Sequence, residues 1–148
     1  MAFHFTLETV LRYRQSLEDR EWLRLQALLA RRSATLSELE QYHQLSLDMA
    51  HATAQAMLVE PTPAVEIHFA TARLQAMGRQ QHLLRLQLSE LETAIAEQRS
   101  RFAQQRRNRE VLESLRDGQW RDYQLAQRRR EQAQLDELHL LRRGTKDR

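Results

Sequence analysis

Residues 74–112 read LQAMGRQQHLLRLQLSELETAIAEQRSRFAQQRRNREVL, and this stretch decides the fold. Along this stretch we follow twelve positions that are separated alternately by three and four residues. These positions are rich in apolar side chains. Eight of these twelve positions are apolar (Leu74, Met77, Leu84, Leu88, Leu91, Ile95, Phe102 and Leu112), and four are polar (Gln81, Gln98, Gln105 and Arg109). A three-four alternation sustained over about five heptads predicts the seam of a coiled coil on one long helix.

The helix that this seam faces is expected in the same chain. Glu60-Pro61-Thr62-Pro63 is a strong break in the helical pattern, because proline lacks a backbone N–H and moves the residue before it out of the helical region. A turn here brings the preceding segment back along the seam. In that segment helical spacing joins Leu7, Leu11, Leu25, Leu28, Leu36, Leu39 and His43, and Arg14 and Glu18 interrupt it as polar residues. We therefore predict an all-α fold, a two-helix antiparallel coiled-coil hairpin with a longer second helix.

The predicted hairpin occupies residues 1–148 as a single unit. Its expected parts are a first helix over about 5–58, a turn at 59–64, a second helix over about 65–142 and a flexible tail at 143–148. If residues equidistant from Thr62 face each other, Thr6 lies opposite Gly118, and roughly the last 25 residues of the second helix overhang as a single helix. Gly118 costs about 1 kcal/mol against alanine inside a helix, and is interpreted either as a hinge or as a tolerated surface glycine.

The composition agrees with a narrow hydrophobic seam. Charged residues make up 29% of the 148 residues and aromatic residues 6%, and the mean hydropathy is -0.72, too polar for a large globular interior. Cysteine is absent, which excludes disulfides, a thiolate zinc site and a thiol nucleophile. Nowhere do eighteen uncharged apolar residues run together. We expect a cytosolic protein, at most peripheral to a membrane and without direct membrane insertion.

Positive charge is concentrated toward the end of the chain. Residues 1–98 carry nine arginines and twelve acids, whereas residues 99–148 carry thirteen arginines, one lysine and eight acids, a net charge of +6. Such a region is a candidate contact surface. Acidic residues interleaved with the arginines would repel phosphates, so we expect a solvated helix face or a protein contact and no nucleic acid.

The sequence contains no catalytic constellation. Gly78, Gly118 and Gly144 lie far apart and form no phosphate-binding loop. The six histidines never occur three or four residues apart on one helix face, so no metal site is expected. A hairpin two helices thick also lacks a pocket that could separate carboxylate pKa values for acid-base chemistry. We therefore predict no enzyme activity and no cofactor.

The polar residues of the predicted seam have two interpretations. They set the register and lower the stability of the coiled coil, or they keep the hairpin supple enough to be repacked by a larger machine. On the first interpretation, leucine in place of Gln98 should stabilise the protein.

Both ends of the chain carry a family pattern. Phe3-His-Phe5-Thr-Leu7-Glu8-Thr-Val10-Leu11-Arg-Tyr-Arg14 resembles the opening of the flagellar export protein FliJ family, whose members commonly start with Phe-x-Phe, Leu-Glu-x-Val-Leu and a nearby arginine. Leu112-Glu113-x-Leu115, Tyr123 and Glu131-Gln132-x-x-Leu135-Asp136-Glu137 match C-terminal positions of the family in order and at similar spacing. The two motifs bracket nearly the whole chain, although this sequence is rich in arginine where relatives are rich in lysine.

The resemblance implies a function and partners. FliJ proteins are antiparallel coiled coils similar to the central stalk of rotary ATPases; they insert into the hexameric export ATPase FliI and also engage the export gate FlhA and export chaperones. It implies a cytoplasmic protein held peripherally at the inner membrane, at the flagellar base. The residues that it assigns to the ATPase interface are Phe3, Phe5, Leu7, Glu8, Leu11, Arg14, Arg128, Arg129, Arg130, Gln132, Asp136 and Glu137.

Alternatives remain at this point. The stalk of a virulence-type secretion system shares the architecture, and a generic coiled-coil scaffold would share the composition. Phe3 and Phe5, which could supply an apolar tip for the ATPase ring, could equally pack against the second helix near Trp120 and Tyr123.

Overall fold

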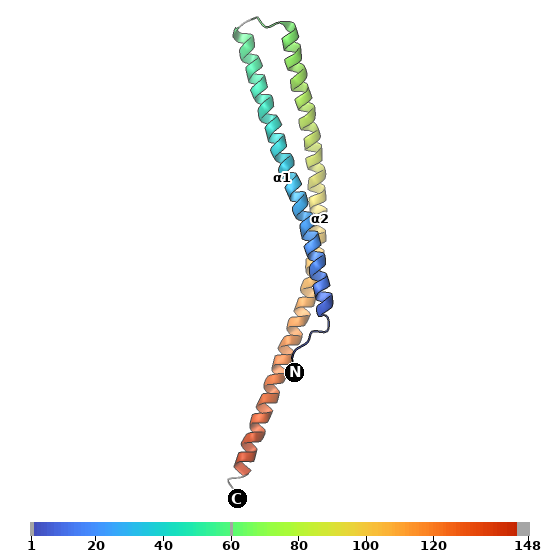
Figure 1. The fold of residues 1–148 in the computed structure, drawn as a ribbon, viewed down its shortest axis with the longest axis vertical. Helices are drawn as coiled ribbons and strands as arrows, with labels where there is room; N and C mark the ends of the chain where they lie inside the picture. Colours follow the sequence, from blue (N-terminus) through green and yellow to red (C-terminus); the bar gives the residue numbers. More distant parts are fainter. Residues whose placement is uncertain (1, 60, 145–148) are drawn as a thin grey trace. The chain divides into compact units, whose positions relative to one another are not determined.

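The structure, a computed structural model, describes residues 2–59 and 61–144 and contains two helices, α1 (Glu8–Val59) and α2 (Ala64–Gly144) (Figure 1). No strand occurs among these residues, and the predicted all-α class is confirmed. Helix α1 begins three residues later than expected, and α2 extends two residues further, so 143 and 144 are helical. The rest of the predicted flexible tail, and residue 60 of the predicted turn, lie outside the described residues.

Local chemistry explains where the helices begin. The N–H of Glu8 donates to the carbonyl of Phe5 (3.2 Å), and the acidic Glu8 lies in the first turn of α1, where the helix dipole favours negative charge. At the start of α2, the carbonyl of Pro63 accepts hydrogen bonds from Glu66 (3.0 Å) and Ile67 (3.3 Å). Proline is favourable at this position, because the residue that precedes a helix does not donate its backbone N–H to a hydrogen bond within that helix.

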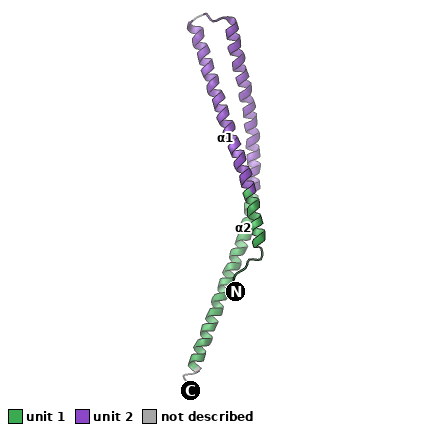
Figure 2. Ribbon diagram, in the orientation of Figure 1, with its two compact units in different colours: residues 1–19, 103–148 green, residues 20–102 purple. Residues whose placement is uncertain are grey.

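The chain divides into two compact units (Figure 2). Unit 1 comprises residues 1–19 and 103–148, and unit 2 comprises residues 20–102. Each unit pairs a stretch of α1 with a stretch of α2 that runs in the opposite direction. In unit 2, Arg32 and Glu92 form an ion pair (3.8 Å). Each of the two is thirty residues from Thr62, as expected when two antiparallel helices face each other on either side of a turn. The predicted antiparallel two-helix hairpin is therefore confirmed.

The predicted seam of α2 lies against α1. Leu84, Leu91 and Ile95 are buried, as are the polar Gln81 and Gln98. The remaining predicted positions are half-buried: Leu74, Met77, Leu88, Phe102, Gln105, Arg109 and Leu112. Since most other α2 residues are exposed, the hydrophobic contact is a single stripe, as expected for a coiled coil.

The seam of α1 differs from the predicted one. Its least exposed residues continue the three-four spacing through Leu7, Leu11, Arg14, Glu18, Glu21, Leu25, Leu28, Arg32, Thr35, Leu39, Tyr42, Ser46, Met49 and Thr53. Leu36 (41% exposed) and His43 lie outside it, so their predicted places were wrong, and Thr35 and Tyr42 occupy the seam instead. The hydroxyl of Thr35 donates to the carbonyl of Arg31 (3.0 Å), which satisfies a polar group that the seam buries.

Polar residues of the unit 2 seam are hydrogen-bonded across it. The Gln98 amide donates to the Glu21 carbonyl (3.0 Å) and to the Glu21 carboxylate. The Gln81 amide donates to the Tyr42 carbonyl (3.2 Å) and to the Ser46 hydroxyl (3.2 Å). Leucine at 98 would remove the amide donor from two part-buried Glu21 acceptors, and we expect this loss to outweigh the gain from added apolar area. These hydrogen bonds lead us to expect that leucine destabilises this position, the opposite of the expectation from the sequence.

The helices of unit 2 diverge toward the turn (Figure 1). Every residue at 54–59 and 63–69 is exposed, including the large apolar Leu58 and Phe69. The half-buried residues next to this end, Thr53 and Ala70, offer little apolar surface to hold the helices together. Packing in unit 2 is therefore strongest away from the turn.

Candidate functional site

The ends of the chain in unit 1 form the candidate site, which begins with residues 2–7 ahead of α1. We call this the N-terminal segment. Phe5 is 3% exposed, and Leu11, one turn into α1, is 1% exposed. Leu7 is half-buried between them in the sequence, and its carbonyl accepts from the Leu11 N–H (2.9 Å). Phe5 and Leu11 therefore belong to the core of unit 1 in this conformation.

An aromatic cluster joins the N-terminal segment to α2. The Phe3 ring meets Trp120 edge-on, with 5.1 Å between centroids, and lies 5.6 Å from Tyr123. Trp120 and Tyr123 stack on each other at 5.6 Å with an interplanar angle of 19°. Both geometries are favourable for aromatic pairs. For Phe3, the expected packing near Trp120 and Tyr123 is observed, and Phe5 is buried.

The balance that holds this segment is narrow. Fixing one backbone residue costs about 1–2 kcal/mol, and fully burying one phenylalanine contributes about 1.5–3 kcal/mol. The segment orders several residues, with Phe5 fully buried and Phe3 half-buried. The cost of ordering residues 2–7 is therefore at least as large as the gain from the two rings, so the segment is only weakly held.

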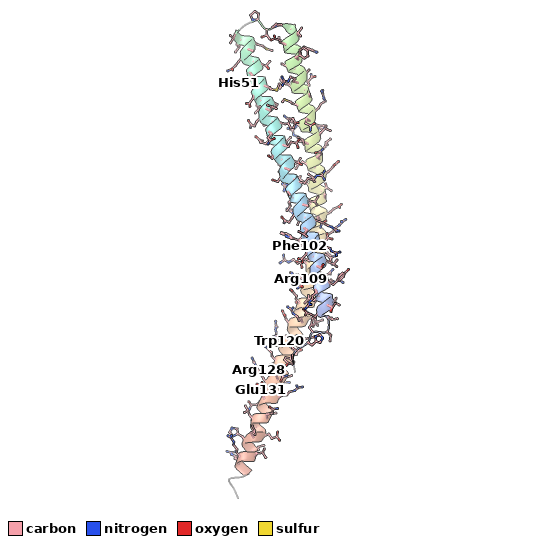
Figure 3. The ribbon with its side chains drawn as sticks, viewed as in Figure 1. His51, Phe102, Arg109, Trp120, Arg128 and Glu131 are labelled. Atoms are coloured by element: carbon pink, nitrogen blue, oxygen red, sulfur yellow. The ribbon has the colours of Figure 1, made fainter. Side chains whose placement is uncertain are left out.

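A charged layer crosses unit 1 at Arg109, which is labelled in Figure 3. Arg109 of α2 forms ion pairs with Glu18 of α1 and with Glu113 one turn further along α2. The hydrogen bond to Glu18 is the main cause that raises the pKa of the Arg109 guanidinium above its usual value; burial opposes this shift, and Glu113 adds to it. The three side chains are only 19%, 14% and 30% exposed, so the arginine is held as a cation inside the seam.

The C-terminal part of α2 is exposed. From 124 to 143 every residue is exposed except Gln127, which is half-buried. Arg128, Arg129 and Arg130 project from this stretch, and Figure 3 shows Arg128 and Glu131 there. The Gln132 amide donates to the Asp136 carboxylate within the same helix (2.9 Å). We call residues 124–143 the basic overhang.

The structure thus sorts the twelve candidate interface residues into three groups. Phe5 and Leu11 are buried, and Phe3, Leu7, Glu8 and Arg14 are half-buried; Arg128, Arg129, Arg130, Gln132, Asp136 and Glu137 are exposed. Glu8 forms an ion pair with Arg12 (3.5 Å) on the outside of α1. Aromatic packing joins the N-terminal group to α2 near Trp120, but the basic overhang lies further along α2. The interhelical pair of Glu18 and Arg109 was missed, because the spacing within each helix does not relate a polar position of one seam to a polar position of the other.

Neither a metal site nor a membrane span occurs in the described residues. Across 2–59 and 61–144, no three histidine, cysteine, aspartate or glutamate side chains are grouped so that they could hold a metal ion. Within the same ranges, neither helix contains a stretch apolar enough to cross a bilayer.

Fold and site together define a coiled-coil hairpin protein. Its candidate site consists of an aromatic cluster and an exposed basic helix, the kinds of side chain that suit contacts with other proteins. The family model described as flagellar FliJ protein matches residues 3–147. The chain belongs to the FliJ family, which confirms the resemblance found at its two ends, and it has a role related to flagellar protein export. The family is a non-catalytic component of that export. Comparison with curated proteins and with solved structures gave no match.

Proposed function

We propose that this protein is a stalk-like component of flagellar type III export, which inserts into the hexameric ATPase FliI and stimulates ATP hydrolysis. The observation that carries the proposal is the family match over residues 3–147, together with an antiparallel hairpin whose second helix continues as a basic overhang. A narrow, stiff coiled coil suits the pore of a ring. Exposed arginines suit contacts that are weak and replaceable as each ATPase subunit changes state.

The proposal includes further partners and a location. The stalk links the ATPase to the export gate FlhA and to export chaperones, in the cytoplasm at the inner membrane. The flagellar family match favours this system over the stalk of a virulence-type secretion system. The family match also favours it over a generic scaffold, and a gene neighbourhood with a flagellar ATPase would add independent support.

The test is binding to the purified export ATPase and stimulation of its hydrolysis. Reversing Arg128, Arg129 and Arg130 to glutamate should weaken binding at least tenfold, because six units of charge change on an exposed surface. Binding of the unaltered protein should also weaken as salt rises, since exposed charges are screened.

A matched control reverses three other exposed arginines, Arg73, Arg79 and Arg85, in unit 2. This control makes the same charge change away from the basic overhang and should retain binding. Circular dichroism must show that both variants remain helical. Equal binding by the overhang variant and the control would contradict the proposed interface.

A further inference from the structure

The aromatic side chains of the N-terminal segment pack within this chain. The same side chains would be needed for contact with a partner. At 3% exposure, Phe5 has almost no surface that a partner could contact. Phe3 is half-buried, with its ring against Trp120 and Tyr123. In this conformation, therefore, the apolar end of the proposed stalk is packed on α2.

This attachment differs in kind from the packing of α1. The segment lies outside the helix, and the hydrogen bond that shapes it is local, from the Glu8 N–H to the Phe5 carbonyl at 3.2 Å. The backbone entropy that the segment regains on release is at least as large as the aromatic burial that it loses. A segment of this kind opens more readily than the helices beside it.

We propose that residues 2–7 are a strap that packs on Tyr123 and on part of Trp120 when closed, and that is released when the ATPase ring binds. The inference rests on the proposed function and adds a regulatory step to it. The basic overhang is exposed while the strap is closed, so charge makes the first contact with the ring. Opening then supplies Phe3 and Phe5, together with the uncovered Trp120 and Tyr123, as apolar surface. Closing reduces this exposed apolar surface when no ring is present, and Trp120 is then 42% exposed.

The first test needs no partner. Phenylalanine in place of Trp22 leaves Trp120 as the only tryptophan, because the sequence contains two. Alanine at position 3 in the same background gives the emission of Trp120 without Phe3. On heating, the emission of Trp120 should become that of the alanine variant at a lower temperature than the temperature at which the helical circular dichroism signal is lost. Coincidence of the two transitions would overturn independent opening of the strap.

The second test locks the strap. The protein has no cysteine, so cysteines in place of Ala2 and Gln124, next to Phe3 and Tyr123, can be joined by a reducible thiol crosslinker. The linked protein should bind and stimulate the export ATPase at least tenfold less than the same protein after reduction. As a control, cysteines in place of Arg32 and Glu92, an ion pair within unit 2, are linked in the same way. This link should leave binding unchanged.

The outcomes separate the two proposals. Undiminished binding by the strap-linked protein would overturn release of the strap, and equal loss with the control link would do the same. If the reduced protein does not bind the ATPase, the proposed function fails and the regulatory role of the strap fails with it. Independent opening is still decided by the tryptophan measurement in that case.

Discussion

Replacing Arg109 with methionine should destabilise the protein by about 2 kcal/mol. Methionine keeps much of the length of the side chain and removes its charge, which leaves Glu18 and Glu113 without their shared cation. Removing one partner of a fully buried ion pair costs about 3–5 kcal/mol. An exposed pair contributes about 0–1 kcal/mol. The carboxylate side chains are 14% and 30% exposed, so an intermediate value is expected.

A double-mutant cycle separates the ion pair from the packing of the arginine. Glutamine in place of Glu18 is the second single change, and the variant with both changes completes the cycle. Because Arg109 and Glu18 are in contact, the double variant should be more stable than the sum of the single effects by at least about 1 kcal/mol. Urea unfolding followed by circular dichroism gives all four free energies of unfolding. Additivity within about 0.5 kcal/mol would refute the interaction.

The pH dependence has a definite sign. Glu18 and Glu113 raise the pKa of Arg109 in the folded protein. A base with a raised pKa stabilises the fold at every pH below its ordinary value, and this contribution is lost only as the pH rises through the folded value. Arginine remains charged across the range in which proteins are handled. The contribution of the guanidinium should therefore be constant between about pH 6 and pH 9.

Three further results are expected. Leucine in place of Gln98 should destabilise the hairpin by about 1–3 kcal/mol in urea unfolding, because the part-buried carbonyl and carboxylate of Glu21 lose the amide donor of Gln98; stabilisation would contradict the hydrogen bonds. Alanine in place of Gly118 should stabilise by about 1 kcal/mol, since an added Cβ has no neighbour within 4 Å outside its own stretch of helix. The same change lowers ATPase stimulation only if Gly118 is a hinge. Spin labels replacing Arg32 and Glu92 should couple strongly within one chain, and loss of coupling on dilution with unlabelled protein would indicate a dimer instead.

The seam of α2 could be predicted from sequence because its apolar residues recur with an unbroken three-four spacing. Leu84, Leu91 and Ile95 are buried where the three-four spacing places them. The seam of α1 could not be predicted fully, because hydrophobicity favours Leu36 over its neighbour Thr35. Thr35 fits the seam through a hydrogen bond to its own helix, which a hydrophobic pattern does not record.

Sequence also could not identify the partners that the polar seam residues have on the opposite helix. Gln98 could be placed in the seam, but the donor and acceptor relation to Glu21 depends on the register across two helices. The same holds for Arg109 and Glu18, which are 91 residues apart. For Phe3, sequence could name both packing on Trp120 and contact with a partner, and only the folded chain separates them.

Site-specific photo-crosslinking tests the central claim most directly, namely that the basic overhang, and not the turn, enters the ATPase ring. A photoreactive amino acid in place of Arg129 lies on the basic overhang, and one in place of Val65, which is 64% exposed, lies beside the turn. With the assembled export ATPase present, irradiation should link position 129 to the ATPase and leave position 65 unlinked. Crosslinks from position 65 and none from position 129 would contradict the account.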